Sequence, residues 1–369
     1  MKSLILFILL ISLSTLGTTQ TTHDRIEATI MDYIDGTSYN LIPRIQNAFH
    51  SESDLFLDGK DDSIRIVPSG TYISWFEKNK PGEFNGRVGN ILSIESFGNI
   101  ATAKAEILLP HRNLRFVDMF ILKEELGQWK IISKTANSEK SNMNGERVLF
   151  ITSNARFYGN TDIKTGNSLS EIINAYTTFR EAGYIVDFVS PEGGDIPIAY
   201  IDFRDDRMMK NVRDSEFMYR IAHTKKIGDI KAEDYMAVYF VGGGSAMFNV
   251  PMNKEIQTLA MSIYEEHNGV IASVCHGTAG IVNLKTKDGK YLVDGKRISG
   301  YPDEYERKDD EYYKTFPFAI SPLIRERGGD FQYSPRNTIH IEAQDNVVTG
   351  QNHLSSEAVA EKVIELLKK

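Results

Sequence analysis

The sequence predicts two domains: an α+β domain, followed by an α/β domain with a mostly parallel sheet. The chain has 369 residues, which is more than a single domain usually contains. In the N-terminal third, helical patterns come first and strands afterwards, which is typical of helices packed on a curved antiparallel sheet. Beyond residue 147, strands and helices alternate, which indicates an open parallel sheet covered by helices on both faces.

The first 20 residues predict a secretory signal. Lys2 precedes the apolar run Leu4–Ile11, and small polar residues follow that run as far as Gln20. This order is typical of a cleavable signal peptide, and the run is short for a bilayer span. We therefore expect an exported protein, periplasmic or secreted, with cleavage near Gly17 to Gln20 and no stable membrane insertion afterwards. An uncleaved membrane anchor is the alternative.

The composition is that of an ordinary globular protein, with 41% hydrophobic and 25% charged residues. The net charge is -8, and the Lys and Arg residues are scattered rather than grouped. This distribution argues against a general nucleic-acid or anionic-membrane partner.

Residues 22–137 form the first predicted domain. Apolar residues recur at helical spacing from Ile26 to Ile34 and again from Leu41 to Phe49. After these helices the pattern predicts strands at 54–58 and 62–67, a helix at 70–78, and strands at 87–96, 100–109, 115–124 and 128–133. Asn99 fits a hairpin turn between two of the long strands.

The first domain resembles the nuclear transport factor 2-like superfamily and, within it, the lumazine-binding group. Besides the element order, the resemblance rests on Asn47–His50 at the end of the second helix and Gly127–Ile131 near the end of the sheet. It implies a cone-shaped pocket used for binding or dimerisation. His50, Asp58 and His111 are candidates for polar pocket groups, with loop-end or surface positions as the preferred alternative.

Residues 138–146 are polar and lack periodicity, which predicts a linker, and residues 147–369 form the second domain. Its pattern predicts strands at 147–152, 184–189, 235–241 and 270–274, and helices at 169–182, 253–267, 317–327 and 356–367. A polar excursion at 191–230 forms either a lid or a surface decoration. In such sheets the site lies at the carboxyl ends of the strands.

The single cysteine, Cys275, directly follows the apolar run Val270–Val274 and precedes small residues. A sharp strand-to-helix turn would raise its side chain above the sheet, facing the amides of the helix N-terminus. Those amides favour the thiolate, which is the reactive species. A lone cysteine in an exported chain has no intrachain partner, so a reactive role explains it better than a buried structural one.

Two further features of the second domain suggest chemistry. Gly242–Gly244 follow a strand, where missing side chains let backbone amides approach a developing oxyanion. Glu171 lies early in a helix, where a single glutamate is by default an exposed acid. No metal-ligand spacing is found among His223, His267, His340 and His353, so we expect neither metal nor cofactor.

Residues 147–369 resemble the DJ-1/PfpI superfamily, within the class I glutamine amidotransferase-like fold, a flavodoxin-like arrangement. The nearest subgroup is the heat-shock protein 31-like branch. The matching stretches are Thr152–Tyr158, Lys164–Gly166, Thr178–Pro191, Val241–Phe248, Val274–Gly277, Asp294–Lys296, Ile298–Gly300, Pro317–Phe318, Arg327–Gly328 and Val348–Asn352.

This resemblance implies a set of site residues and a homodimer. The reactive residues would be Cys275, His276 and Glu171, with Glu306 orienting the histidine and Asp303 as its alternative. The oxyanion and substrate would lie against Gly243, Gly244 and Gly277. The chain departs from the branch in the pocket wall: Gly244 stands where the branch often has histidine, Ser245 replaces a glycine, and Thr278 replaces a proline.

The preferred interpretation is an exported cysteine-dependent enzyme resembling glutathione-independent glyoxalases. Such a lyase of the glyoxalase III (D-lactate dehydratase) type, with a role in stress response, converts small reactive 2-oxoaldehydes to 2-hydroxy acids. The reaction would pass through a Cys275 hemithioacetal, with Glu171 moving the proton. One alternative is a non-catalytic chaperone or thiol sensor. Another is a cysteine amidase or peptidase in which Cys275, His276 and an acid near Glu306 form a triad.

Overall fold

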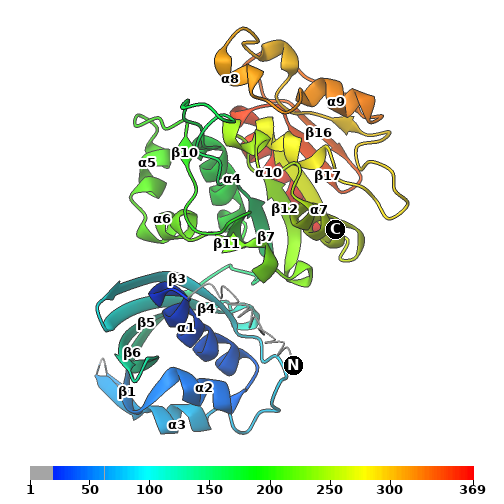
Figure 1. The fold of residues 1–369 in the computed structure, drawn as a ribbon. Coiled ribbons are helices and arrows are strands. Elements are labelled where there is room, and N and C mark those ends of the chain that lie inside the picture. The colour runs from blue at the N-terminus through cyan, green and yellow to red at the C-terminus, as the bar shows by residue number, and fades with distance from the viewer. Residues whose placement is uncertain (1–19, 62) are drawn as a thin grey trace, which may run out of the picture.

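The computed structural model describes residues 20–61 and 63–369. The predicted signal peptide lies outside the described residues, except for Gln20. No helix in the described part of the chain is both long and apolar enough to cross a membrane. The two large sheets, of six and seven strands, occupy separate parts of the molecule (Figure 1).

The N-terminal domain combines three helices with a six-stranded sheet, counting the described residues. Its helices are α1 (Thr22–Ser38), α2 (Ile42–Ala48) and α3 (Ser69–Ser74). Its strands are β1 (Phe49–Asp58), β2 (Ile64–Pro68), β3 (Val88–Phe97), β4 (Ile100–Leu109), β5 (Leu114–Glu125) and β6 (Gln128–Lys140). A capping box between Thr21 and Asp24 fixes the start of α1, whose apolar face is buried in the domain core.

The strand order is β2-β1-β6-β5-β4-β3. Strands β3 to β6 form the antiparallel meander that the sequence predicts. β1 joins β6 in parallel, so the sheet is mixed, which the meander alone did not indicate. Several boundaries also differ. β1 begins five residues earlier than predicted, α3 ends four residues early, and β6 continues to Lys140 because its residues remain paired with β5. The first three residues of the predicted linker are therefore strand.

The C-terminal domain contains a seven-stranded sheet in the order β11-β9-β7-β12-β13-β17-β16. These strands are β7 (Arg147–Ile151), β9 (Ile185–Ser190), β11 (Lys225–Lys226), β12 (Tyr235–Phe240), β13 (Val270–Val274), β16 (Ile341–Gln344) and β17 (Val347–Gly350). All neighbours pair in parallel except β16 and β17. Short bridges outside this sheet are β8 (Asn167–Ser168) with β10 (Ile198–Ala199), and β14 (Arg297–Ile298) with β15 (Asp330–Phe331).

Helices cover both faces of this sheet, as the sequence predicts. They are α4 (Leu169–Glu181), α5 (Asp206–Val212), α6 (Ser215–Ala222), α7 (Lys254–Glu265), α8 (Glu311–Lys314), α9 (Ile320–Glu326) and α10 (Ser356–Leu367). α4 and α10 pack into the core on one face, and α7 and α9 pack into the core on the other. α9 is shorter than predicted, because Phe316 and Phe318 pack against the core before the helix begins.

The excursion between residues 191 and 230 joins the two domains. It folds into β10, α5, α6 and β11, and α6 packs against β3 of the N-terminal domain. Figure 1 shows α6 and β11 facing β3 across the boundary. Ion pairs and hydrogen bonds cross here: Lys104 to Glu216, the Arg147 guanidinium to the Gly89 carbonyl, and His23 to Tyr219.

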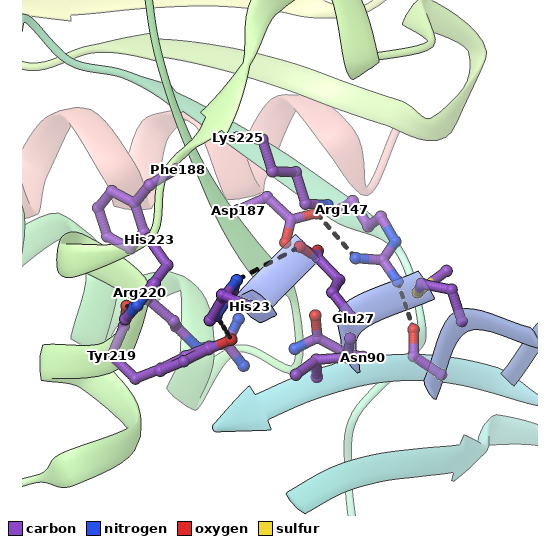
Figure 2. A pocket seen from close by; sticks show the side chains of 13 residues that line it. His23, Glu27, Asn90, Arg147, Asp187, Phe188, Tyr219, Arg220, His223 and Lys225 are labelled. Carbon is purple, nitrogen blue, oxygen red and sulfur yellow. Dashed lines mark hydrogen bonds and ion pairs between the residues drawn. The ribbon is translucent and has the colours of Figure 1, made fainter. Parts of the chain in front are cut away.

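A cavity of about 110 Å³ lies along this boundary (Figure 2). His23 and Glu27 reach it from α1, while Tyr219 and His223 reach it from α6 and its C-terminal end. The His23 Nε2 atom lies 2.8 Å from the Tyr219 hydroxyl, and its ring stacks on His223 at 4.5 Å. Burial, and then the neighbouring His223, lower the pKa of His23. The two domains therefore share polar contacts as well as apolar ones.

Glu106 on β4 is the centre of the boundary. Its side chain is fully buried, accepts a hydrogen bond from Arg115 at 2.9 Å, and faces Arg180 and Arg220 of the other domain at 3.5 and 3.7 Å. Burial alone would raise the pKa of this carboxyl, but the three guanidinium groups outweigh it and lower the pKa to about 2. The carboxylate thus compensates cations that belong to both domains.

We expect Glu106→Gln to lower the free energy of unfolding by about 3 kcal/mol, because it removes the carboxylate that pairs with the buried Arg220 and the partly buried Arg180. Urea denaturation at pH 7 measures the change. Since the folded pKa is depressed, the stabilisation is present above the unfolded pKa, about 4.5, and is lost as the pH falls toward about 2. The difference in unfolding free energy between the unmodified protein and Glu106→Gln should therefore shrink as the pH falls through this range.

Glu139→Gln is the matched control. Glu139 also pairs with Arg115, at 2.8 Å, but its side chain is 59% exposed. Exposed pairs contribute little, so this change should alter stability by less than about 1 kcal/mol. Equal effects of the two substitutions at pH 7 would contradict the role given to Glu106.

Candidate active site

Cys275 stands at a strained turn between β13 and a short 3₁₀ helix, Cys275–Ile281. Its φ of +55° lies in the left-handed region, which side chains other than glycine seldom adopt. The Tyr301 amide donates to its carbonyl at 3.1 Å and helps to hold the turn. β13 lies between β12 and β17, so the turn lies at the carboxyl end of an inner strand of the sheet. This is the sharp strand-to-helix geometry that the sequence predicts.

His276 connects the thiol to an acid. Its Nδ1 lies 3.6 Å from the Cys275 sulfur, and its Nε2 lies 2.7 Å from Oε1 of Glu306. The ring also stacks on Tyr301 at 4.7 Å, which fixes its plane. Of the two acids considered from the sequence, the structure places Glu306 against the histidine, whereas Asp303 bonds to Tyr313 and Lys308.

Glu171 lies in the first turn of α4 and is 2% exposed. A Cβ atom added to Gly242 would collide with Oε2 of Glu171 and would lie 3.0 Å from the Cys275 Cβ, so the three residues meet. Burial raises the pKa of Glu171 to about 8, against the opposing contacts with the Cys275 thiol, Ser168 and the Gly242 amide. A carboxyl group with such a pKa exchanges protons near neutral pH.

The thiol itself behaves differently from the sequence-based expectation. Burial, followed by the nearby Glu171, raises the pKa of Cys275 well above its usual value, although the His276 amide acts in the opposite direction. The amide at the turn therefore favours the thiolate, as the sequence predicts, but burial and Glu171 outweigh it in the resting protein. The physical reason is that Cys275 is only 8% exposed and lies beside a second acidic group, while the following helix is one short 3₁₀ segment.

The three glycines after β12 bring backbone close to the site. Gly243 has a φ of +99°, and a Cβ there would collide with Ser168 at the start of α4. A Cβ at Gly244 would collide with the Tyr158 hydroxyl, and one at Gly277 would collide with the Phe240 carbonyl. The predicted oxyanion residues Gly243, Gly244 and Gly277 therefore occupy positions that have no room for a side chain.

Sequence reasoning missed a tyrosine of the site. The Tyr312 hydroxyl donates to Oε2 of Glu306 at 2.9 Å, on the side away from the histidine. The neighbouring Tyr313 donates to Asp303 instead. The position of Tyr312, six residues after Glu306, was the available signal.

The N-terminal candidates do not come together. His50 lies beside Glu125 at a distance of 3.6 Å, while Asp58 and His111 are exposed. The alternative of loop-end and surface positions fits these residues. The sequence also did not indicate a buried polar cluster of that domain, in which Lys134 donates to Asp118 at 2.9 Å and Tyr33 donates to the same carboxylate at 2.6 Å.

A cysteine on a strained turn, a histidine–glutamate pair behind it and a second buried glutamate define an α/β protein with a nucleophile elbow. The chain belongs to the DJ-1/PfpI family, which matches residues 163–366, more than half of its length. Residues 21–136 match the family described as "Putative lumazine-binding". Both matches agree with the resemblances drawn from the sequence.

Several named relatives are similar over the second domain. The glutathione-independent glyoxalase HSP31 of Saccharomyces cerevisiae is 30% identical over 235 residues, covering 60% of this chain and 97% of the relative. The glutathione-independent glyoxalase hsp3102 of Schizosaccharomyces pombe is 29% identical over 215 residues, covering 55% and 89%. Glyoxalase 3 of Candida albicans is 29% identical over 230 residues, covering 59% and 96%.

Solved structures support the fold of the same region. The rapid encystment protein of 24 kDa from Francisella tularensis has a TM-score of 0.56 and 27% identity, covering 60% of this chain and 99% of that one. Glyoxalase III of Candida albicans has a TM-score of 0.54 and 24% identity, covering 60% and 96%.

Proposed function

We propose that this protein is an exported, cysteine-dependent enzyme that converts small 2-oxoaldehydes to 2-hydroxy acids without glutathione. The observation that carries the proposal is the meeting of Cys275 and Glu171 at Gly242, in a chain whose relatives are named glutathione-independent glyoxalases. This rearrangement needs a nucleophile that bonds to the aldehyde carbon and, close to it in space, a carboxyl group that transfers the proton. Export rests on the pattern of the first 20 residues.

The first step is addition of the thiol to the aldehyde. The sulfur of Cys275 bonds to the aldehyde carbon, the carbonyl electrons move to oxygen, and that oxygen takes up a proton to give a hemithioacetal. Glu171 and His276 are the groups beside the sulfur that can take and return this proton. The amides of Gly243 and Gly244 would stabilise the negative oxygen.

The second step moves hydrogen between adjacent carbons. Glu171 removes the proton from the former aldehyde carbon, giving an enediol, and a proton is then delivered to the neighbouring carbon. The product is a thioester of the 2-hydroxy acid on Cys275. Water hydrolyses the thioester, releases the acid and restores the thiol, so the sum is addition of one water with no oxidant or reductant.

His276 and its partners support these steps by position. The Glu306 carboxylate accepts from the Nε2–H of the ring at 2.7 Å, and the Tyr312 hydroxyl donates to the other oxygen of Glu306 at 2.9 Å. These contacts keep the Nδ1 atom of His276 directed at the Cys275 sulfur, 3.6 Å away. Orientation of this kind is typical of an acid–base histidine.

The direct test is incubation of the purified protein with methylglyoxal in the absence of glutathione, followed by quantification of D- and L-lactate. We expect lactate formation in proportion to protein concentration and consumption of the aldehyde in a one-to-one ratio. Loss of methylglyoxal without lactate would contradict the proposal, because it would indicate only thiol adduct formation.

A second candidate function is hydrolysis of an amide or peptide bond. It is favoured by the continuous chain from Cys275 through His276 to Glu306, which has the order of a nucleophile–base–acid triad. An acyl-type cysteine probe distinguishes it: labelling that turns over, and that is lost in His276→Ala, supports hydrolysis. Stable labelling without turnover speaks against it.

A further inference from the structure

Two hydroxyl groups lie against the last glycine of the turn after β12. A Cβ added to Gly244 would collide with the hydroxyl of Tyr158 and would lie 2.6 Å from Oγ1 of Thr165. Both residues come from one loop, in which the Tyr158 amide donates to the Ile163 carbonyl and the Thr165 amide donates to the Arg156 carbonyl, at 2.9 Å each. The loop therefore presents the two hydroxyls together at the turn.

The Thr165 hydroxyl is buried without a hydrogen-bond partner among the described residues. The residue is 8% exposed, so water from the surface does not replace the missing partner freely. Buried hydroxyl groups nearly always have a partner, so an unsatisfied one indicates a place where a ligand or an ordered water supplies it.

Tyr158 is held rigidly by aromatic neighbours. Its ring lies 5.3 Å from Tyr312, 6.1 Å from Phe316 and 6.2 Å from Phe248, measured between ring centroids. Tyr312 in turn bonds to Glu306, the partner of His276. The Tyr158 hydroxyl thus belongs to the same wall that fixes the histidine, and its position relative to the turn is set by packing.

The hydroxyl pair and the Cys275 side chain contact the same glycine turn. Gly242 contacts Cys275 and Glu171, and Gly244, two residues further, contacts Tyr158 and Thr165. Two Cα steps span at most about 7 Å. In a substrate bonded to the sulfur through its aldehyde carbon, the second oxygen requires a partner about 6 Å from the sulfur, if its hydrogen bond is about 2.8 Å long. The size of the turn is compatible with this requirement.

We infer that Tyr158 and Thr165 form an oxygen-binding subsite that holds the second oxygen of the substrate. The inference rests on the proposed function and deepens it, because it makes these two hydroxyls the basis of selectivity for 2-oxoaldehydes over simple aldehydes. In the thioester and the product, the same subsite holds the 2-hydroxyl group. The two residues are specificity-determining: they bind the oxygen and take no part in proton transfer between the carbons.

Two measurements test the subsite. Thr165→Val keeps the shape and removes the hydroxyl, and should raise KM for methylglyoxal about 10-fold while kcat changes less than about 3-fold. Tyr158→Phe should act in the same direction. Competitive inhibition by propionaldehyde, which lacks the second oxygen, should be the same in both variants as in the unmodified protein.

The second measurement does not depend on turnover. Lactate should slow alkylation of Cys275 by iodoacetamide, followed by mass spectrometry, and the protecting concentration should rise about 10-fold in Thr165→Val. Thr177→Val is the control, because the Thr177 hydroxyl is also buried without a partner in the described chain but lies six residues after Glu171 on α4.

The outcomes separate the two proposals. Lost protection in Thr165→Val with full protection in Thr177→Val supports the subsite, even in a protein that forms no lactate from methylglyoxal. If the protein does not convert methylglyoxal, the proposed function is contradicted. The protection of Cys275 by lactate can still be measured and still tests the subsite. Equal protection in both variants, or no protection of the unmodified protein by saturating lactate, overturns the subsite.

Discussion

With Cys275 replaced by alanine, we expect conversion of methylglyoxal to lactate to fall by at least about 1,000-fold, in line with the loss of a covalent nucleophile. The chain has no other cysteine, so no second thiol is available to form the hemithioacetal or the thioester. His276 and Glu171 would remain. Without the Cys275 sulfur, however, the aldehyde carbon of the substrate is not bonded to the protein, and Glu171 has no fixed carbon from which to remove a proton. Lactate formation under glutathione-free conditions measures the effect.

Stability must be measured alongside activity in this variant. Cys275 is buried in the core cluster beneath α4 and α10, so alanine leaves a small cavity there. A thermal midpoint within a few degrees of the unmodified protein, together with turnover at the background level, assigns the loss to chemistry. Turnover above one tenth of the original would mean that Cys275 is not the nucleophile.

The regular elements of the second domain were predictable because local pattern decides them. The run Val270–Val274 is apolar throughout, as a strand buried on both faces must be, and the structure has β13 at those residues. α10 also covers the predicted residues, Ser356–Leu367. Here the hydrophobic period and the burial requirement point to the same element.

The strands at the start of the first domain were harder to place. β1 finds its parallel partner in β6, the last strand of its sheet, so nothing near β1 in the sequence indicates this pairing. The predicted strand 54–58 consequently begins too late, since β1 starts at Phe49. Register and partner choice depend on long-range packing rather than on local propensity.

Charge compensation across the domain boundary was also outside the reach of sequence reasoning. Glu106 meets Arg180 and Arg220, which lie 74 and 114 residues further along the chain. A glutamate in a strand shows no pattern that distinguishes a buried ion pair from a solvated surface. The excursion at 191–230, whose role the sequence left open, supplies Arg220 on α6 and explains why the two domains meet at this place.

The resting protonation state of the site followed from neither motif nor family. A strand-to-helix turn suggested a stabilised thiolate, but burial beside Glu171 raises the pKa of Cys275 instead. The thiol therefore needs a nearby base when substrate arrives, which gives Glu171 a role in both the addition and the proton transfer that follows.

Glu171→Gln is accordingly the second large effect that we expect. The amide keeps the shape of the side chain but neither accepts nor donates the substrate proton, so kcat should fall by roughly 100- to 10,000-fold, the range of general acid–base catalysis. Alkylation of Cys275 by iodoacetamide should still occur. Glu181→Gln is the control, since Glu181 ends the same helix and is exposed, and its activity should be unchanged.

The pH dependence tests the same role from another direction. Because the pKa of Glu171 is raised to about 8, the carboxyl group is mostly protonated at neutral pH and is then unable to accept a proton. For the unmodified protein, kcat/KM for methylglyoxal should therefore rise with pH up to about 8 and level off above it, with a slope approaching tenfold per pH unit on the acidic side. The residual activity of Glu171→Gln should lack this rise, because the titrating carboxyl group is gone. If the rise near pH 8 persisted in Glu171→Gln, another group would carry it, and Glu171 would be left with a structural role beside the thiol.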